Sequence, residues 1–135
     1  MIDYSAPRFP DAEITAIPEI DFATLPESPR IIKVPDVHAN HGMVFEGVFR
    51  HPNPNLTSVI VRIEFQNQVP GERSKSLTLA ANGRDGVLKF RAEVRAEIPP
   101  GNYTVLVSVK LPDPDDPVRH RRKQVAVGRG ELKVL

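Results

Sequence analysis

Hydrophobic and polar residues alternate along most of the chain after residue 30. The alternation is regular over residues 43–50, 57–66, 88–95 and 102–111, and shorter strand patterns occupy 30–34, 76–79 and 123–135. A period of two is that of a β-strand with one buried face and one exposed face. About seven such strands, spaced by roughly a dozen residues, predict antiparallel sheets that pack on one side only. The pattern therefore predicts an all-β fold.

Turn-forming residues separate these strands. They are the segment 51–55, Gly71, the dipeptides Asn82-Gly83 and Asp85-Gly86, the segment 99–101, and the segment 112–117. The two dipeptides are of the kind that closes tight hairpins. Gly128 and Gly130 flank Arg129 inside the last strand pattern, which predicts a bulge or a sharp corner there.

One strand entry resembles a known family. Pro100-Gly101-Asn102-Tyr103-Thr104-Val105-Leu106-Val107 is similar to the entry strand of bacterial immunoglobulin-like and fibronectin type III-like domains. The resemblance implies an immunoglobulin-like antiparallel β-sandwich of about seven strands over residues 30–135, in which the tyrosine caps a corner between the two sheets. The chain departs from true immunoglobulin domains because it lacks tryptophan and the cysteine pair. The resemblance therefore implies an architecture and no particular partner.

Residues 1–29 form a proline-punctuated acidic segment with five prolines, which exclude long helices. Its apolar side chains distinguish it from an ordinary flexible leader. We expect an extended N-terminal arm that lies against its own domain or against a neighbouring molecule, and a flexible leader is the alternative. The candidate partner-binding residues of this arm are Tyr4, Phe9, Ile14, Ile17 and Phe22.

Composition limits what the chain can be. Its 135 residues suffice for one domain with a core of its own. Because the chain has no cysteine, disulfides, thiolate metal sites and cysteine nucleophiles are excluded. The N-terminus shows no signal-peptide pattern and no window is long and apolar enough for a membrane span. We therefore expect a cytoplasmic protein as synthesised, which a larger particle could incorporate.

Charge is distributed unevenly. Residues 1–28 contain six acidic and one basic side chain, whereas the remainder contains seventeen basic and eleven acidic ones. A basic run supplies further candidate contacts for a protein or polyanion, namely Arg119, Arg121, Arg122 and Lys123. The run lacks interleaved aromatic residues, and the isoelectric point near 8.1 is low for a nucleic-acid-binding protein. Both observations argue against nucleic acid as the partner.

Candidate chemistry is sparse. His38 and His41, with Asp36 nearby and His51 one strand away, are the one spacing that suggests a metal, but a loop pair needs a third ligand. The acidic residues between 113 and 116 lack the glycine and the distant glutamate of a calcium loop. No serine lies in a nucleophile elbow and no glycine-rich loop suits a phosphate. We therefore predict no enzyme activity, no cofactor, no metal and no small-molecule substrate.

The first functional hypothesis is a non-catalytic structural or protein-interaction module. It would be an accessory subunit of a larger assembly, such as a virion, an appendage or an enzyme complex, and would dock through its N-terminal arm or self-assemble. The second hypothesis is a ligand-binding module for carbohydrate or a small polyanion. The third is a metal or redox accessory protein that uses His38 and His41.

Overall fold

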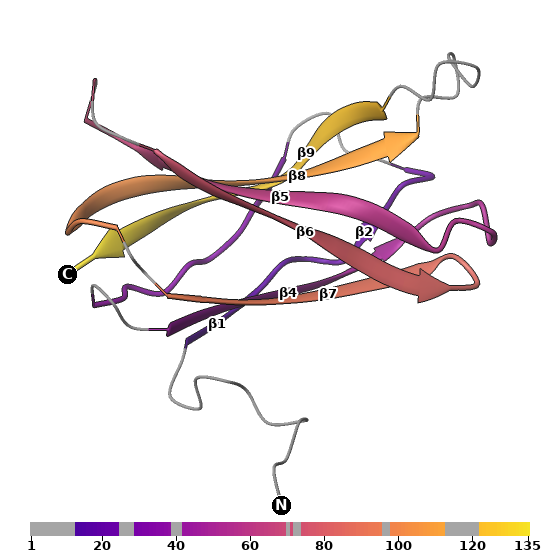
Figure 1. The fold of residues 1–135 in the computed structure, drawn as a ribbon, viewed down its shortest axis with the longest axis horizontal. Helices are drawn as coiled ribbons and strands as arrows, with labels where there is room; N and C mark the ends of the chain where they lie inside the picture. The colour runs from indigo at the N-terminus through magenta and orange to yellow at the C-terminus, as the bar shows by residue number, and fades with distance from the viewer. Residues whose placement is uncertain are drawn as a thin grey trace, which may run out of the picture.

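The chain folds into β-strands, and the described part contains no helix (Figure 1). The computed structural model describes residues 13–24, 29–38, 42–69, 71, 74–95, 98–112 and 122–135. The strands are β1 (Glu13–Ala16), β2 (Ile20–Asp21), β3 (Arg30–Ile31), β4 (Gly42–Arg50), β5 (Ser58–Asn67), β6 (Lys75–Arg84), β7 (Val87–Arg95), β8 (Gly101–Pro112) and β9 (Arg122–Val134). The prediction of an all-β protein is confirmed. In particular, these residues include no helix that could cross a membrane.

The nine strands belong to one continuous sheet, in the order β1-β4-β7-β6-β5-β8-β9-β3, with β2 also paired to β4. The sheet curls so that its β1-β4-β7 half faces its β5-β8-β9 half (Figure 1). The two separate sheets that the sequence predicts are therefore not observed. The physical reason is β6, a ten-residue strand that pairs with β5 along most of its length and with β7 at its C-terminal end.

The core lies between the two halves of the curled sheet and follows the predicted alternation. Buried side chains come from every second position of the long strands: Met43, Phe45 and Phe49 of β4, Val59, Val61, Ile63 and Phe65 of β5, Leu88, Phe90 and Ala92 of β7, and Tyr103, Val105, Val107 and Val109 of β8. Phe45 and Phe65 meet edge-on with ring centroids 5.9 Å apart, which joins the two halves through β4 and β5.

The β6–β7 hairpin turns at Asp85-Gly86. Both residues have positive φ angles, 57° and 79°, as a two-residue type I′ turn requires. The other predicted turn, Asn82-Gly83, is wrong, because both residues belong to β6. A side chain at Gly83 would meet the carbonyl oxygen of Val87, so glycine allows the close approach of the two hairpin strands.

The N-terminal segment from residue 13 to 22 pairs with the chain's own β4. Strands β1 and β2 run parallel to β4, with Ala16 opposite Glu46 and Ile20 opposite Phe49. The amide of Phe22 continues this contact by donating to the carbonyl of Arg50. Within this protein the segment therefore docks in cis, and it contributes Ile17 and Ile20 to the core.

The opposite edge of the sheet is formed by residues 30–37, which follow β9 in the parallel direction. Ile32 donates its amide to the carbonyl of Arg129 and buries its side chain in the core. Side chains at Gly128 and Gly130 would meet Ile32, so the two glycines form the socket for this residue. The irregularity predicted at Gly128 to Gly130 lies one residue earlier: these residues pair in register with β8, and the register shifts between Val107 and Ser108, where Val127 has no partner in β8.

Candidate interaction surfaces

The candidate contacts of the N-terminal arm divide into three groups. Tyr4 and Phe9 lie outside the described residues, and Ile14 lies in β1. Ile17 is 5% exposed and belongs to the core. Phe22 packs against that core with its ring 5.5 Å from Phe49 and 5.9 Å from His51. Ile17 and Phe22 thus contact their own domain, so a partner would have to displace them.

The candidate basic contacts are only partly described. Arg122 and Lys123 are the first two residues of β9, and Arg119 and Arg121 lie outside the described residues together with the acidic segment before them. Of this run, the structure places Arg122 and Lys123 opposite Pro112 and Leu111 at the end of β8.

The histidines do not meet in the described part of the chain. His38 is exposed after the Val37 bridge, while His51 is half-buried at the end of β4, and His41 and His120 lie outside the described residues. Among the residues that the structure describes, no group of three potential metal-binding side chains occurs. His51 accepts a hydrogen bond at Nδ1 from the amide of Asn53, at 3.0 Å. Burial lowers the pKa of His51 below its ordinary value of 6.5.

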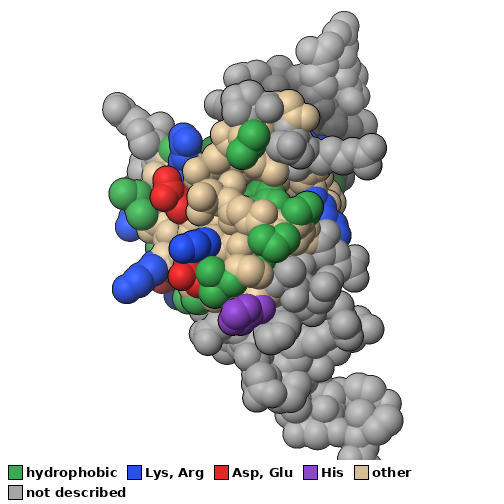
Figure 2. Space-filling view, turned by 90° about the vertical axis from the view of Figure 1, so that its left-hand side faces the viewer, with side chains coloured by type: hydrophobic (Ala, Val, Ile, Leu, Met, Phe, Trp, Pro, Cys, Tyr) green, Lys and Arg blue, Asp and Glu red, His purple; other side chains and the backbone are tan. Residues whose placement is uncertain are grey.

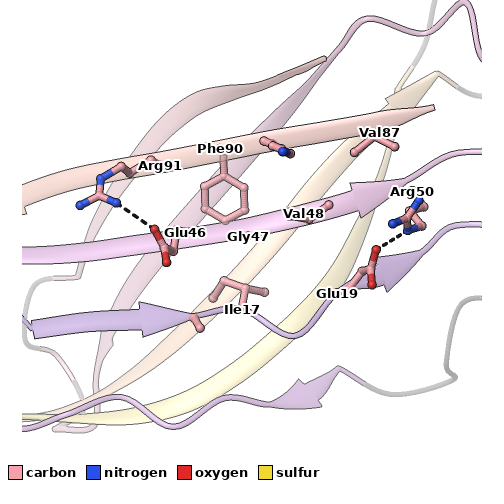
Figure 3. Close-up of a pocket in the computed structure, with 11 residues that line it drawn as sticks. Ile17, Glu19, Glu46, Gly47, Val48, Arg50, Val87, Phe90 and Arg91 are labelled. Atoms are coloured by element: carbon pink, nitrogen blue, oxygen red, sulfur yellow. Dashed lines mark hydrogen bonds and ion pairs between the residues drawn. The ribbon is translucent and has the colours of Figure 1, made fainter. Parts of the chain in front are cut away.

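An open groove of about 820 Å³ crosses the β1-β4-β7 half of the sheet (Figure 3). Ion pairs mark its two ends. At one end Arg91 bonds Glu46 at 2.9 Å, and at the other Arg50 bonds Glu19. Between them lie Val48 and the aliphatic or aromatic side chains of Ile17, Val87 and Phe90.

The groove exists because glycine stands at position 47. A side chain there would meet the Phe90 ring at 2.7 Å and Cβ of Ile17 at 3.1 Å. Phe90 is 5% exposed, so the groove offers aliphatic and charged contacts and little aromatic surface. Lys89 is the one groove cation without an ion-pair partner among the described residues, because Arg50 and Arg91 are both neutralised locally.

The edge strand β3 presents the most exposed large hydrophobic residue that the structure describes. The side chain of Ile31 is 90% exposed. It borders a shallow surface that also includes Val34, Lys33, Arg129 and Glu131. Together with Arg30, these residues define the β3 edge surface. Its three cations, at positions 30, 33 and 129, form no ion pair with any described residue.

The backbone of Ile31 is also directed outward. In the parallel pair with β9, the amide of Ile32 donates to Arg129, so the groups facing β9 belong to the residues on either side of Ile31. The amide and carbonyl of Ile31 itself point to the open edge. An extended segment from another molecule could pair with these groups while it covers the isoleucine side chain.

The sequence did not predict the β3 edge surface, although two adjacent isoleucines in a strand pattern indicate that one of them is exposed. Ile31 and Ile32 are adjacent in a strand, so their side chains must lie on opposite faces. One of the two must then leave the core. The pattern does not say which one is exposed, because that depends on the glycine socket in β9.

Comparison with known proteins gives no relative for this arrangement: no family model, no curated protein and no solved structure matches the chain. The surface itself is mixed in character. At the end of the molecule near the C-terminus, hydrophobic side chains form small groups between acidic and basic ones (Figure 2). Val69 and Leu135 are the other large hydrophobic residues exposed in the described chain.

Proposed function

We propose that this protein is a non-catalytic protein-interaction module, an accessory subunit of a larger assembly that binds its partner at the β3 edge surface. The observation behind the proposal is the 90% exposure of Ile31 at an open strand edge. The three cations Arg30, Lys33 and Arg129 outnumber the one carboxylate of this surface, Glu131, and so favour an acidic partner segment. The partner would present an extended, acidic strand with one apolar side chain over Ile31.

The N-terminal arm is then not the surface that binds the partner. Ile17 and Phe22 are engaged in cis, and the same segment supplies strands β1 and β2 to the sheet. The role of this segment is then to complete the module, while the opposite edge of the sheet remains open for the partner.

We further infer that the curled sheet is a variant of the immunoglobulin-like sandwich. Two observations support this relationship. The β4-β7 pair faces the β6-β5-β8-β9 group across the core, with β6 shared between the two halves. Tyr103, at the start of β8, donates its hydroxyl to the carbonyl of Pro99 at 2.6 Å, which is the geometry of a tyrosine corner.

The partner can be captured and the contact tested in two steps. A photo-crosslinking amino acid at position 31 identifies the partner, and binding is then measured with both purified proteins. Ile31→Asp should raise the Kd at least about tenfold, because it removes the apolar contact and adds a charge that repels an acidic segment. Val69→Asp is the matched control, since Val69 is 57% exposed elsewhere and should bind as wild type does. Equal affinities of wild type and Ile31→Asp would refute the proposed surface.

A further inference from the structure

A second strand edge lies open in the middle of the sheet. Strand β6 pairs with β5 from Lys75 to Asn82, but its ladder with β7 covers only Asn82 to Arg84. On the N-terminal side of Asn82, away from the hairpin turn, β6 separates from β7 (Figure 1). From Ser76 to Ala80, no strand in the described chain pairs with the side of β6 that faces away from β5.

The hairpin geometry shows which backbone groups occupy this open edge. In a two-residue hairpin, the residues flanking the turn, Arg84 and Val87, form a hydrogen-bonded pair. Even-numbered residues of β6 therefore direct their amides and carbonyls toward the β7 side. The amide of Gly83 agrees with this parity, because it donates to Thr57 on the β5 side. The backbone groups of Ser76, Thr78 and Ala80 consequently point to the open edge.

The side chains along this edge suit another strand. Ser76, Thr78 and Ala80 are small and exposed, and Leu77 and Leu79 are only partly buried against the core. The edge contains no proline and no inward-pointing charge, which are the usual devices that prevent strand addition.

We propose that two copies of this protein associate through antiparallel pairing of β6 with β6, with a two-fold axis at Thr78. This inference goes beyond the proposed function and uses a different edge. It is the one antiparallel register that pairs all three open residues with one another: Thr78 with Thr78 of the second copy, and each Ser76 with an Ala80.

The sequence is self-complementary in this register. Threonine opposite threonine is a favourable cross-strand pair, and serine opposite alanine brings no clash. On the inner face each Leu77 lies opposite a Leu79, so four partly buried leucines gain a common apolar contact. Lys75 falls opposite Ala81, and the register therefore places no like charges opposite one another.

A charge-swap experiment tests the axis. Sedimentation equilibrium of wild type should give a mass twice the 15.0 kDa of the chain. Thr78→Lys and Thr78→Glu each place two like charges across the axis, so each alone should raise the dimer Kd at least about tenfold. An equimolar mixture of the two should restore the dimer as a heterodimer. Thr57→Lys, an exposed threonine on the neighbouring chain segment, should leave the dimer intact.

A cysteine crosslink tests the same axis without adding charge to the strand. The protein has no cysteine, so Thr78→Cys introduces one unique thiol per chain. Directly opposite residues in a hydrogen-bonded pair lie about 5.5 Å apart, within the range that a disulfide spans. Thr78→Cys should crosslink to a dimer on oxidation, and Thr57→Cys should not. A monomeric wild type, a dimer insensitive to both charged variants, or a mixture that stays monomeric would each overturn the proposal.

Discussion

At the scale of single residues, the glycines of β9 show how one missing side chain positions a whole segment. Gly130 lies where a Cβ atom would be 2.5 Å from the carbonyl oxygen of Ile32, whereas a Cβ at Gly128 would be 3.2 Å from a methyl group of the same residue. The backbone oxygen cannot move without breaking the pairing of residues 30–32 with β9, but a methyl group can shift slightly.

Gly130→Ala should therefore destabilise the protein more than Gly128→Ala. We expect Gly130→Ala to lower the free energy of unfolding by about 1–3 kcal/mol and Gly128→Ala by less, because overpacking against backbone is relieved only by moving the strand. Urea denaturation of the two variants measures the difference. Equal losses would show that the segment 30–34 adapts freely to the added methyl group.

His51 is a second residue whose surroundings predict a measurable effect. Its folded pKa is lowered by burial, while the unfolded chain takes up a proton near 6.5. The unfolded state then binds more protons below this pH, so the stability from neutral His51 is complete above pH 6.5 and declines as the pH falls below it. His51→Asn keeps an acceptor for the Asn53 amide and does not titrate.

The free energy of unfolding should consequently fall more steeply for wild type than for His51→Asn when the pH is lowered from 7.5 to about 5.5. Urea denaturation at several pH values gives both curves, and the difference between them isolates His51 from the carboxylates. Parallel curves would contradict the effect of burial on this histidine.

At the scale of elements, the turn before β8 is held by a hydrogen bond between residues four apart in the chain. Tyr103 is buried and its hydroxyl bonds the carbonyl of Pro99, which fixes the chain as it enters the strand. The turn residues Pro99, Pro100 and Gly101 before this strand were visible in the sequence, but the hydrogen bond was not. The bond spans four residues and does not depend on the sheet order.

Tyr103→Phe removes the hydroxyl and keeps the ring in the core. We expect the free energy of unfolding to fall by about 1 kcal/mol, the usual net contribution of one hydrogen bond, with the circular dichroism spectrum unchanged. Tyr103→Leu is a useful comparison, since it also removes ring contacts and should cost more. A Tyr103→Phe variant as stable as wild type would mean that water replaces the tyrosine hydroxyl without loss.

The β-strands also show where pattern analysis succeeds and where it fails. Residues 43–50 and 57–66 place apolar residues at every second position, so their core-facing sides could be assigned from the sequence, and Phe45, Phe49, Val61 and Ile63 are buried as expected. Val44 lies on the opposite side of its strand and is buried as well, which the alternation did not predict. The turn predicted at Asn82-Gly83 was wrong, because the dipeptide has the composition of a turn but both residues belong to β6. The adjacent Asp85-Gly86 forms the turn instead, and a chain of two strands needs only one.

At the scale of the whole molecule, the N-terminal segment is part of the core rather than an addition to it. Ile20 of β2 is 1% exposed where this strand pairs with β4, and Phe22 packs on Phe49 next to it. Because the segment buries apolar side chains and pairs with β4, it contributes to the stability of the folded protein.

Truncation of a buried isoleucine of this segment and of the exposed isoleucine of β3 should therefore have effects of very different size. Ile20→Ala should lower the free energy of unfolding by about 2–4 kcal/mol, because it leaves a cavity in the core. Ile31→Ala, at a 90% exposed side chain, should change it by less than about 0.5 kcal/mol. Thermal or urea unfolding of both variants measures the contrast. Comparable losses would mean that the N-terminal segment does not pack as described.

The sequence by itself determined the all-β class, most strand positions and the core-facing side of the long strands. These properties depend on the alternation of side chains and on turn residues that act locally. Only the tertiary structure decided that the strands form one curled sheet, that residues 13–22 dock in cis, and that Ile31 and the β6 edge remain open. Strand order and open edges depend on which distant strands meet, and the pattern within a single strand contains no information about its neighbours.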